Sequence, residues 1–247
     1  MDTYYIYEID NYNYLIYIFD LGSSFLYSDC IVYNKFGQKY TFYNSKYYVL
    51  IKKNNYSFSI SYLYYPISFY SSCINWREHW IRKRDYIYNY YLTIKGKYNI
   101  IDESISYYLT LFDYSIYLLK DFSFDSLVSI QHNKMNIDDY FNPFNLRLDY
   151  RERDFAEYLK GIFFSNEYKN IDYKSIINRG IGIFRYELVI SRMIFPSYYF
   201  DLFDNIVLNN KEQSILNEIL NRQSEYNNYI KNIINIIGII PEKKVPF

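Results

Sequence analysis

Cysteine is scarce in this chain of 247 residues, which contains only Cys30 and Cys73. The two residues lie far apart in the sequence and form no C-x-x-C pair, so the pattern excludes a metal site of the zinc-finger type. A disulfide between them is not expected in a reducing cytoplasm, where thiols are kept reduced. Cysteine chemistry therefore gives no indication of function.

Long apolar runs are also missing. No stretch reaches the roughly 18 apolar residues that a transmembrane helix needs. The N-terminal segment "MDTYYIYEIDNYNY" has no basic region followed by an apolar core, and the apolar segment "YIKNIINIIGII" (229–240) is interrupted by Lys231 and by asparagines. The sequence predicts neither a membrane span nor a signal peptide.

An excess of one charge is absent too, because 27 basic residues balance 27 acidic ones. Proteins that bind nucleic acid usually concentrate basic residues on one face. The local basic run "WIRKRDY" (80–86) fits the solvated face of a helix, with a membrane-surface or RNA contact as the alternative. We expect no nucleic-acid partner.

Aromatic side chains are what the chain has in abundance, with 36 tyrosines and 19 phenylalanines, and half of all residues are apolar. Together with frequent Lys, Asn and Ile and a near absence of Ala, this composition indicates an AT-rich genome rather than a tyrosine-dependent function. A chain this apolar has the composition of a folded protein and not of a disordered one.

The first 70 residues alternate between apolar and polar side chains, as β-strands do. In "YSFSISY" (56–62), Phe58, Ile60 and Tyr62 fall on one face and serines on the other. Turn residues separate the other candidate strands, which are "TYYIYEI" (3–9), "YLIYIFDL" (14–21), "FLYSDCIVY" (25–33) and "KYYVLIKK" (46–53). This succession predicts a small antiparallel meander sheet over residues 1–72.

After residue 72 the apolar period changes to that of helices. Trp76, Trp80, Ile87 and Tyr91 fall on one stripe, and Asn75 begins a pattern that resembles a capping box. Further helices are expected after Asp102, over about 153–164, 183–194 and 197–207, and from about Lys211, with an irregular or strand-like region at 121–150.

This layout predicts the fold class. We expect an α+β, kinase-like two-lobed fold, in which residues 1–72 form a small antiparallel β lobe and residues 73–247 a larger helical lobe. The two lobes would form a single kinase-like unit. The layout by itself does not give the function.

The segment "NPFNLRLDYRERDFAEY" (142–158) reads like the second half of a phosphotransferase catalytic loop. Phosphoryl transfer needs a lysine for the ATP phosphates, an aspartate for the acceptor hydroxyl, and oxygen ligands for Mg²⁺. Asn145 and Asp149 have the residue types and approximate spacing of such metal ligands. The alternative is an asparagine in the turn after Pro143 and an aspartate near a helix N-terminus.

The rest of the expected site departs from this pattern. Lys52 ends a strand and is the candidate for binding the ATP phosphates, although lysine also often ends a solvent-exposed strand. Gly22 stands alone where a glycine-rich loop belongs. Counting back five residues from Asn145 reaches Tyr140 instead of a catalytic aspartate, and a phenol with an unperturbed pKa near 10 is no carboxylate base. Asp139 would need a one-residue bulge to replace it.

Two segments carry a family resemblance, "YFNPFNLRLDYRERDFAEYLKGIFF" (140–164) and "MIFPSYYFDLFDNIV" (193–207). They resemble the bacterial spore-coat kinase-like proteins of the CotS/YutH type, which are similar to aminoglycoside and choline phosphotransferases. The resemblance covers about residues 73–210. It implies a kinase-like fold used in building the coat of an endospore, located in the mother cell cytoplasm or in the spore coat.

The resemblance also implies roles for individual residues. Asn145 and Asp149 would be relics of metal ligands, and His132 the relic of a catalytic-loop histidine. Asp154 would be structural, as a carboxylate in the first turn of a helix is favoured by the helix dipole.

Our leading hypothesis is a degenerate kinase-like protein that acts as a structural or interaction component, without a cofactor, with other coat proteins or its own copies as partners. The second hypothesis is an active small-molecule phosphotransferase that uses Asp139, while Lys52, Asn145 and Asp149 hold Mg-ATP. A third is a plain globular protein from an AT-rich bacterium or virus, in which the kinase pattern is accidental.

Overall fold

The structure is a computed structural model, and it describes residues 4–9, 32–33, 39–43, 46–52, 58–66, 68–70, 75–123, 127–137, 140 and 145–238. The chain divides into two compact units. The first combines Met1–Ser71 with Leu127–Asp154, and the second combines Ser72–Ser126 with Phe155–Phe247. The predicted boundary between domains at residue 72 stays a prediction.

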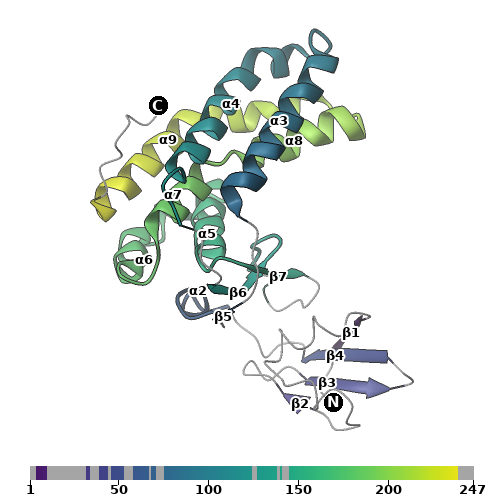
Figure 1. The fold of residues 1–247 in the computed structure, drawn as a ribbon, viewed down its shortest axis with the longest axis vertical. Helices are drawn as coiled ribbons and strands as arrows, with labels where there is room; N and C mark the ends of the chain where they lie inside the picture. Colours follow the sequence, from purple (N-terminus) through teal and green to yellow (C-terminus); the bar gives the residue numbers. More distant parts are fainter. Residues whose placement is uncertain are drawn as a thin grey trace. The chain divides into compact units, whose positions relative to one another are not determined.

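The first unit contains two antiparallel sheets (Figure 1). One has the strand order β1-β4-β3-β2 and the other the order β5-β6-β7. Their strands are β1 (Tyr4–Ile9), β2 (Val32–Tyr33), β3 (Lys39–Tyr43), β4 (Lys46–Lys52), β5 (Ser68–Tyr70), β6 (Leu127–His132) and β7 (Leu146–Asp149). The strands predicted at 3–9 and 46–53 are therefore confirmed, as is the strand-like character of 121–150, whereas 14–21 lies outside the described residues.

The strand predicted at 56–62 is wrong over 58–62, the part of it that the structure describes. The chain instead forms a turn and the short helix α2 (Ser61–Tyr64), whose Leu63 and Tyr64 are buried. The backbone N–H of Ser61 donates to the Ser59 hydroxyl at 3.3 Å, and the Tyr62 N–H donates to the Ser59 carbonyl at 2.9 Å. Serine side chains that bond to nearby backbone compete with strand pairing, and the apolar alternation did not reveal this.

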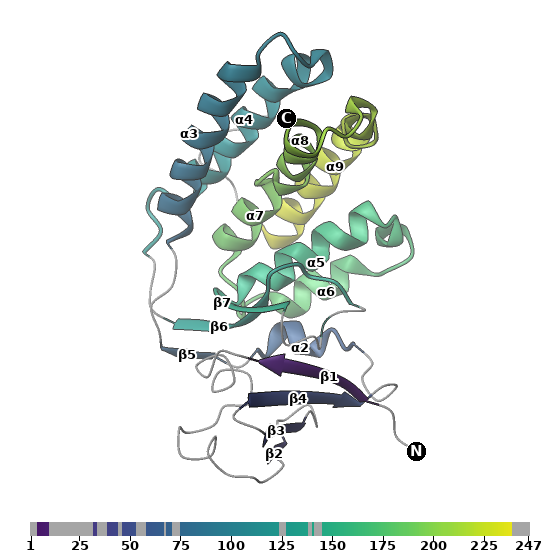
Figure 2. The same cartoon turned by 90° about the vertical axis from the view of Figure 1, so that its right-hand side faces the viewer.

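The second unit is built from helices that pack along one another (Figures 1 and 2). Helices α3 and α4 form an antiparallel hairpin, α4 contacts α7, and α9 contacts α6, α7 and α8. The helices are α3 (Trp76–Ile94), α4 (Asn99–Leu118), α5 (Glu152–Phe164), α6 (Tyr173–Gly180), α7 (Tyr186–Ile194), α8 (Ser197–Asn209) and α9 (Leu216–Ile237). The first three residues of α5 belong to the first unit.

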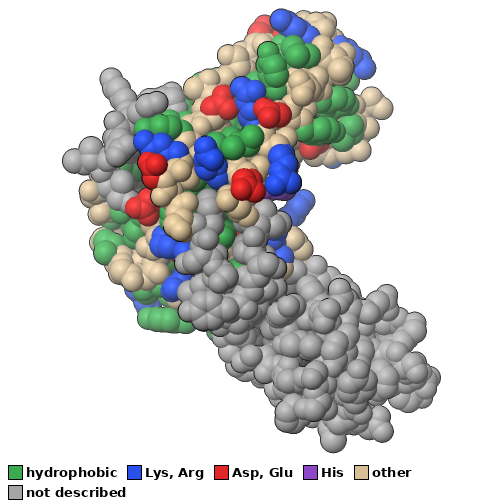
Figure 3. All heavy atoms as spheres, in the orientation of Figure 1, with side chains coloured by type: hydrophobic (Ala, Val, Ile, Leu, Met, Phe, Trp, Pro, Cys, Tyr) green, Lys and Arg blue, Asp and Glu red, His purple; other side chains and the backbone are tan. Residues whose placement is uncertain are grey.

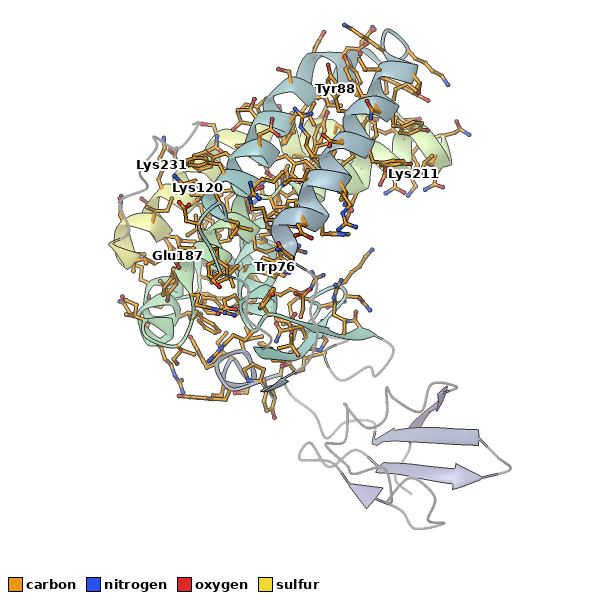
Figure 4. All side chains as sticks on the ribbon, in the orientation of Figure 1. Trp76, Tyr88, Lys120, Glu187, Lys211 and Lys231 are labelled. Carbon is orange, nitrogen blue, oxygen red and sulfur yellow. The ribbon has the colours of Figure 1, made fainter. Side chains whose placement is uncertain are left out.

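Helix α3 illustrates how the sequence specifies these elements. The Asn75 side chain accepts a hydrogen bond from the Glu78 backbone N–H at 3.2 Å, which satisfies a free donor of the first turn. Trp76, which Figure 4 labels, is buried together with Trp80, Ile87 and Tyr91. The predicted apolar stripe is thus confirmed as the inward face of the helix.

Phe195, between α7 and α8, is a centre of the core of the helical unit. Its ring stacks on Trp80 at 4.4 Å and meets the edge of Phe112 at 4.7 Å between centroids. Lys83 and Arg192 lie over the same ring at 5.7 and 5.5 Å, within the range of cation–π attraction. The aromatic residues that dominate the composition therefore serve as core packing here.

The predicted fold class, an α+β kinase-like fold with a β lobe and a larger helical lobe, is wrong. Of the residues whose side chains are described, 71% are helical, so the described structure is mostly helical. The strands are two to seven residues long, whereas the helices from α3 to α9 have 8 to 22 residues. The alternation of apolar and polar residues in the first 70 residues led us to predict a larger share of sheet than the described residues contain.

The surface of the described residues is mixed in charge. On the face drawn in Figure 3, Lys and Arg side chains alternate with Asp and Glu over the helices. Among the described residues, every helix is too short or too polar to cross a lipid bilayer.

Two stacked tyrosines in the helical core give a direct test of buried hydrogen bonding. The rings of Tyr108 and Tyr199 lie 3.8 Å apart between centroids and are both buried. The Tyr199 hydroxyl is 2.8 Å from the Ser104 hydroxyl, whereas the Tyr108 hydroxyl has no hydrogen-bond partner among the described residues. Burial raises the pKa of both phenols, so both hydroxyls stay protonated at neutral pH.

We predict that Tyr108→Phe raises the free energy of unfolding by about 1 kcal/mol, because it removes an unsatisfied buried hydroxyl. The matched variant Tyr199→Phe should lower the same free energy by about 1 kcal/mol, because it breaks a buried hydrogen bond. Urea denaturation followed by circular dichroism measures both. Equal losses in the two variants would mean that the Tyr108 hydroxyl is bonded in solution.

Candidate functional site

The predicted catalytic segment, 142–158, includes β7, which pairs with β6, and the first residues of α5. The two strands pair antiparallel, so that His132 at the end of β6 faces Leu146 at the start of β7. Residues 133–145 connect them, and α5 follows β7 after only two residues. This topology brings polar side chains of both strands to the first turn of α5, within the first unit.

His132 and Asp154 form the centre of this arrangement, and each is 2% exposed. The His132 backbone N–H donates to Asp154 Oδ1 at 2.9 Å, and its ring Nδ1 lies 2.5 Å from Asp154 Oδ2. On the other side of the ring, Nε2 lies 2.7 Å from the Tyr140 carbonyl oxygen. The Asp154 carboxylate thus binds both the main chain and the ring of His132 at the end of β6. The same ring contacts Tyr140 in the segment between β6 and β7.

Gln131 caps α5 from the neighbouring strand. Its Oε1 accepts a hydrogen bond from the Asp154 backbone N–H at 2.8 Å, and its Nε2 donates to the Ser129 hydroxyl at 3.0 Å. The first-turn N–H groups of a helix have no partner within the helix, and side chains commonly satisfy them. Here a residue 23 positions earlier in the sequence does so, which fixes α5 against β6.

Arg153 binds backbone and side-chain oxygens of the same region. Its Nε donates to the His132 carbonyl at 2.8 Å, one terminal nitrogen donates to the Asn133 carbonyl at 2.9 Å, and the other lies 3.4 Å from Asp149 Oδ2. The side chain is 8% exposed. A guanidinium is charged under all physiological conditions, so a permanent positive charge is buried in this cluster.

Asn145, a predicted metal ligand, is engaged by the loop that precedes it. Its Oδ1 accepts from the Lys134 backbone N–H at 3.0 Å, and its Nδ2 donates to the Lys134 carbonyl at 2.8 Å. The Asn145 carbonyl also accepts from the Asn133 N–H at 2.7 Å. The Asn145 side-chain amide therefore joins Lys134 to the start of β7 through two hydrogen bonds, as two paired strand residues are joined.

Asp149, the second predicted ligand, is 1% exposed and faces two arginines. Its Oδ1 accepts from the Tyr150 N–H at 2.9 Å, and its Oδ2 lies 3.4 Å from Arg153. Arg147 Nε lies 3.2 Å from the same Oδ2, close enough for an ion pair but not aligned for a hydrogen bond. Positive charge is thus already supplied to this carboxylate by the protein.

Tyr140, at the position of the missing catalytic base, is buried among aromatic rings. The Phe58 ring lies 5.1 Å from it edge to face, the Tyr62 ring stacks on it at 5.7 Å, and the His132 ring lies at 4.3 Å. Burial raises the pKa of the Tyr140 phenol, and the charge of Asp154 raises it further. The phenol stays protonated near neutral pH and cannot act as a general base.

Two predicted site residues fall outside this description. Lys52 is the last residue of β4, where it pairs in register with Tyr4, and its side chain lies outside the described residues. Asp139 lies outside them entirely. The structure therefore brings Asn145, Asp149 and Tyr140 into one region, and the placement of Lys52 and Asp139 beside them stays a prediction.

Sequence reasoning missed Arg153 and Gln131 and gave Asp154 too small a role. One signal for Arg153 was present, because a cation in the first turn of a helix is disfavoured by the helix dipole and needs a specific partner. Arg153 also stands between two acidic residues, Glu152 and Asp154. No comparable signal marked Gln131, because the strand pattern does not distinguish it from other polar residues.

The described residues of this site do not fit a divalent metal held by Asn145 and Asp149. Mg²⁺ takes oxygen ligands in near-octahedral geometry, but the only side-chain oxygen of Asn145 accepts from Lys134 and Asp149 is paired with two arginines. Nowhere among the residues described do three or more His, Cys, Asp or Glu side chains gather in a way that could hold a metal ion.

The family model described as "Spore coat putative kinase YutH" matches residues 59–233 of the chain. The match confirms the resemblance found in residues 140–164 and 193–207. No curated protein and no solved structure matches the chain.

We predict that Asp154→Asn lowers the free energy of unfolding by about 3 kcal/mol, because it removes a buried charge from a fully bonded cluster. A matched control is Glu187→Gln, since Glu187 lies in the first turn of α7 but is exposed (Figure 4). The control should change stability by no more than about 0.5 kcal/mol. Urea denaturation of both variants measures this free energy. Equal small losses of stability would mean that Asp154 contributes only through its favourable position in the helix dipole.

Proposed function

We propose that this chain, which belongs to the spore coat putative kinase YutH family, is a degenerate kinase-like protein that serves the spore coat through its surfaces and not through phosphate transfer. Its kinase-like and spore-coat character follows from the family. The lack of catalysis is our proposal, and the local structure around Asp149 supports it.

The observation that carries the proposal is the use of both metal-ligand candidates for internal bonding. Asn145 is bonded at both ends of its amide to the Lys134 backbone, and Asp149 is paired with Arg147 and Arg153. A phosphotransferase needs these oxygens for Mg²⁺, since the metal ions bridge the ATP phosphates and neutralise developing charge. In this chain the same oxygens hold the connection between β6 and β7 in place.

The position of the catalytic base supports the same conclusion. A base must carry an accessible lone pair at neutral pH, whereas Tyr140 is buried and the pKa of its phenol is raised. The Tyr140 carbonyl oxygen lies 2.7 Å from His132 Nε2. The Tyr140 ring packs against the rings of Phe58 and Tyr62. Tyr140 acts here as a packing residue.

We further propose that the partners are other spore-coat proteins or copies of the same chain, that no nucleotide cofactor is needed, and that the protein resides in the mother cell or the coat. The family supports the coat assignment. The balance of 27 basic and 27 acidic residues supports a protein partner over a nucleic acid, which would favour a basic excess.

We predict that the full chain gives no binding heat when titrated with ATP in the presence of MgCl₂, and no change in melting temperature under the same conditions. The reason is that the Asn145 side-chain oxygen already accepts a hydrogen bond from the Lys134 N–H, and that the arginines paired with Asp149 disfavour a second cation there. Isothermal titration calorimetry at millimolar nucleotide measures the binding, and Asp149→Ala is the control variant.

Heat that appears with the natural chain and disappears in Asp149→Ala would overturn the proposal. It would restore the alternative, an active phosphotransferase in which Lys52, Asn145 and Asp149 hold Mg-ATP and Asp139 serves the acceptor hydroxyl. Heat that persists in the variant would place the nucleotide elsewhere on the chain.

We also predict that the chain accumulates around the developing spore. A fluorescent fusion of the full chain, produced in a spore-forming bacterium during sporulation, should form a shell around the forespore and remain with purified spores until the coat is extracted. The variant Asp149→Ala should give the same shell as long as it folds, because a role through surfaces does not require the Asp149 carboxylate for chemistry. A diffuse signal throughout the mother cell would contradict a coat role.

A further inference from the structure

We infer that the guanidinium of Arg153 is a permanent internal cation at the place where a kinase-like protein would bind a divalent metal. This inference deepens the proposed function and rests on it, because it gives a physical cause for the loss of metal binding. The site is not merely missing a ligand. It is occupied by a charged group of the protein itself.

The contacts of Arg153 are those that a hard cation would seek. They include two backbone carbonyl oxygens, from His132 at 2.8 Å and Asn133 at 2.9 Å, and one carboxylate oxygen, from Asp149 at 3.4 Å. Carbonyl and carboxylate oxygens are the preferred ligands of Mg²⁺ and Ca²⁺. The three oxygens come from β6, from the connection after it and from β7, so a cation among them holds together parts of the chain that are distant in sequence.

Burial explains why a cation is needed at this place. Asp149 is 1% exposed, and a buried carboxylate is very costly unless a positive charge lies beside it. Arg153 is 6% exposed and supplies that charge without depending on an ion from solution. Arg147 approaches the same oxygen but is 30% exposed and is not aligned for a hydrogen bond, so it is the outer of the two counter-charges.

The position of Arg153 in the chain shows that these contacts outweigh a local disadvantage. It is the second residue of α5, where the helix dipole disfavours a positive charge. The neighbouring acids are Glu152 and Asp154, and Asp154 is bonded to His132 and not to this guanidinium in the contacts described above. The oxygens around Arg153 offset the unfavourable dipole.

Competition between the two cations follows directly. A divalent ion bound to Asp149 Oδ2 would lie within a few ångströms of the Arg153 guanidinium, at which distance like charges repel strongly. The metal can therefore enter only when the arginine is removed. Removal should leave a cavity lined by the oxygens of His132, Asn133 and Asp149, which is a metal site in chemical type.

The test is whether an external cation replaces the one that a mutation removes. We expect Arg153→Ala to lower the melting temperature by about 10 °C, because it leaves the buried carboxylate with only the more exposed and poorly aligned Arg147 beside it. Millimolar MnCl₂, and separately millimolar methylguanidinium chloride, should restore about half of that loss, since a ligand that binds only the folded state stabilises it. The natural chain should show no shift with either additive, and NaCl at matched ionic strength is the salt control.

Three further variants make the result specific. The double variant Asp149→Asn with Arg153→Ala should not respond to MnCl₂, because the carboxylate that holds the metal is gone. Arg153→Lys keeps a positive charge, so it should lose less stability than Arg153→Ala and should not respond either. Arg147→Ala removes the more exposed arginine beside the same carboxylate and should leave the chain close to natural stability.

The outcomes separate this inference from the proposed function. If Arg153→Ala is not stabilised by MnCl₂ or methylguanidinium, or if the natural chain is stabilised by MnCl₂ through Asp149, the internal-cation inference is overturned. If Arg153→Ala does not fold alone, recovery of its folded circular-dichroism signal with either cation supports the inference, and no recovery overturns it. Mg-ATP binding by the natural chain would instead refute the proposed function.

Discussion

The hydrogen bonding between His132 and Asp154 is the constraint on which the local architecture depends. One carboxylate accepts the main-chain N–H of His132 and faces its ring, while the opposite ring nitrogen faces the Tyr140 carbonyl. The end of β6, the start of α5 and the following connection are therefore tied through two side chains. Both are fully removed from water, where polar groups must be bonded to be tolerated, so none of these elements can shift without breaking a costly contact.

This constraint explains why the described polar residues around His132 and Asp154 are held in one arrangement. A buried polar network that is fully bonded makes a structure rigid and specific, whereas a partly bonded one is worse than an apolar core. Gln131 satisfies the first turn of α5, Arg153 the carbonyl oxygens at the end of β6, and Asn145 the backbone of Lys134. These three side chains are therefore part of the internal hydrogen bonding of this region.

Sequence reasoning succeeded where the signal is local. The stripe of Trp76, Trp80, Ile87 and Tyr91 in α3 was readable because helical periodicity depends only on neighbours along the chain. It failed at 56–62, where hydrogen bonding to Ser59 replaces a strand with a turn, and in the fold class, because the alternation at the N-terminus overstated the sheet. In the site, residue types pointed to Asn145 and Asp149, but their partners depend on the pairing of β6 with β7, which no local pattern encodes.

Replacing a metal by an arginine changes what such a loop can do. A bound ion can leave, and its affinity follows its concentration and the protonation of its ligands, whereas a guanidinium is covalently attached and always charged. The contacts of Arg153 with the His132 and Asn133 carbonyls do not depend on ions or nucleotides from solution. That independence has no value for phosphate transfer, which needs the metal to bridge the phosphates. It is of direct value to a protein whose surfaces must present the same shape throughout assembly, because the internal cation then stabilises the fold that the partners contact.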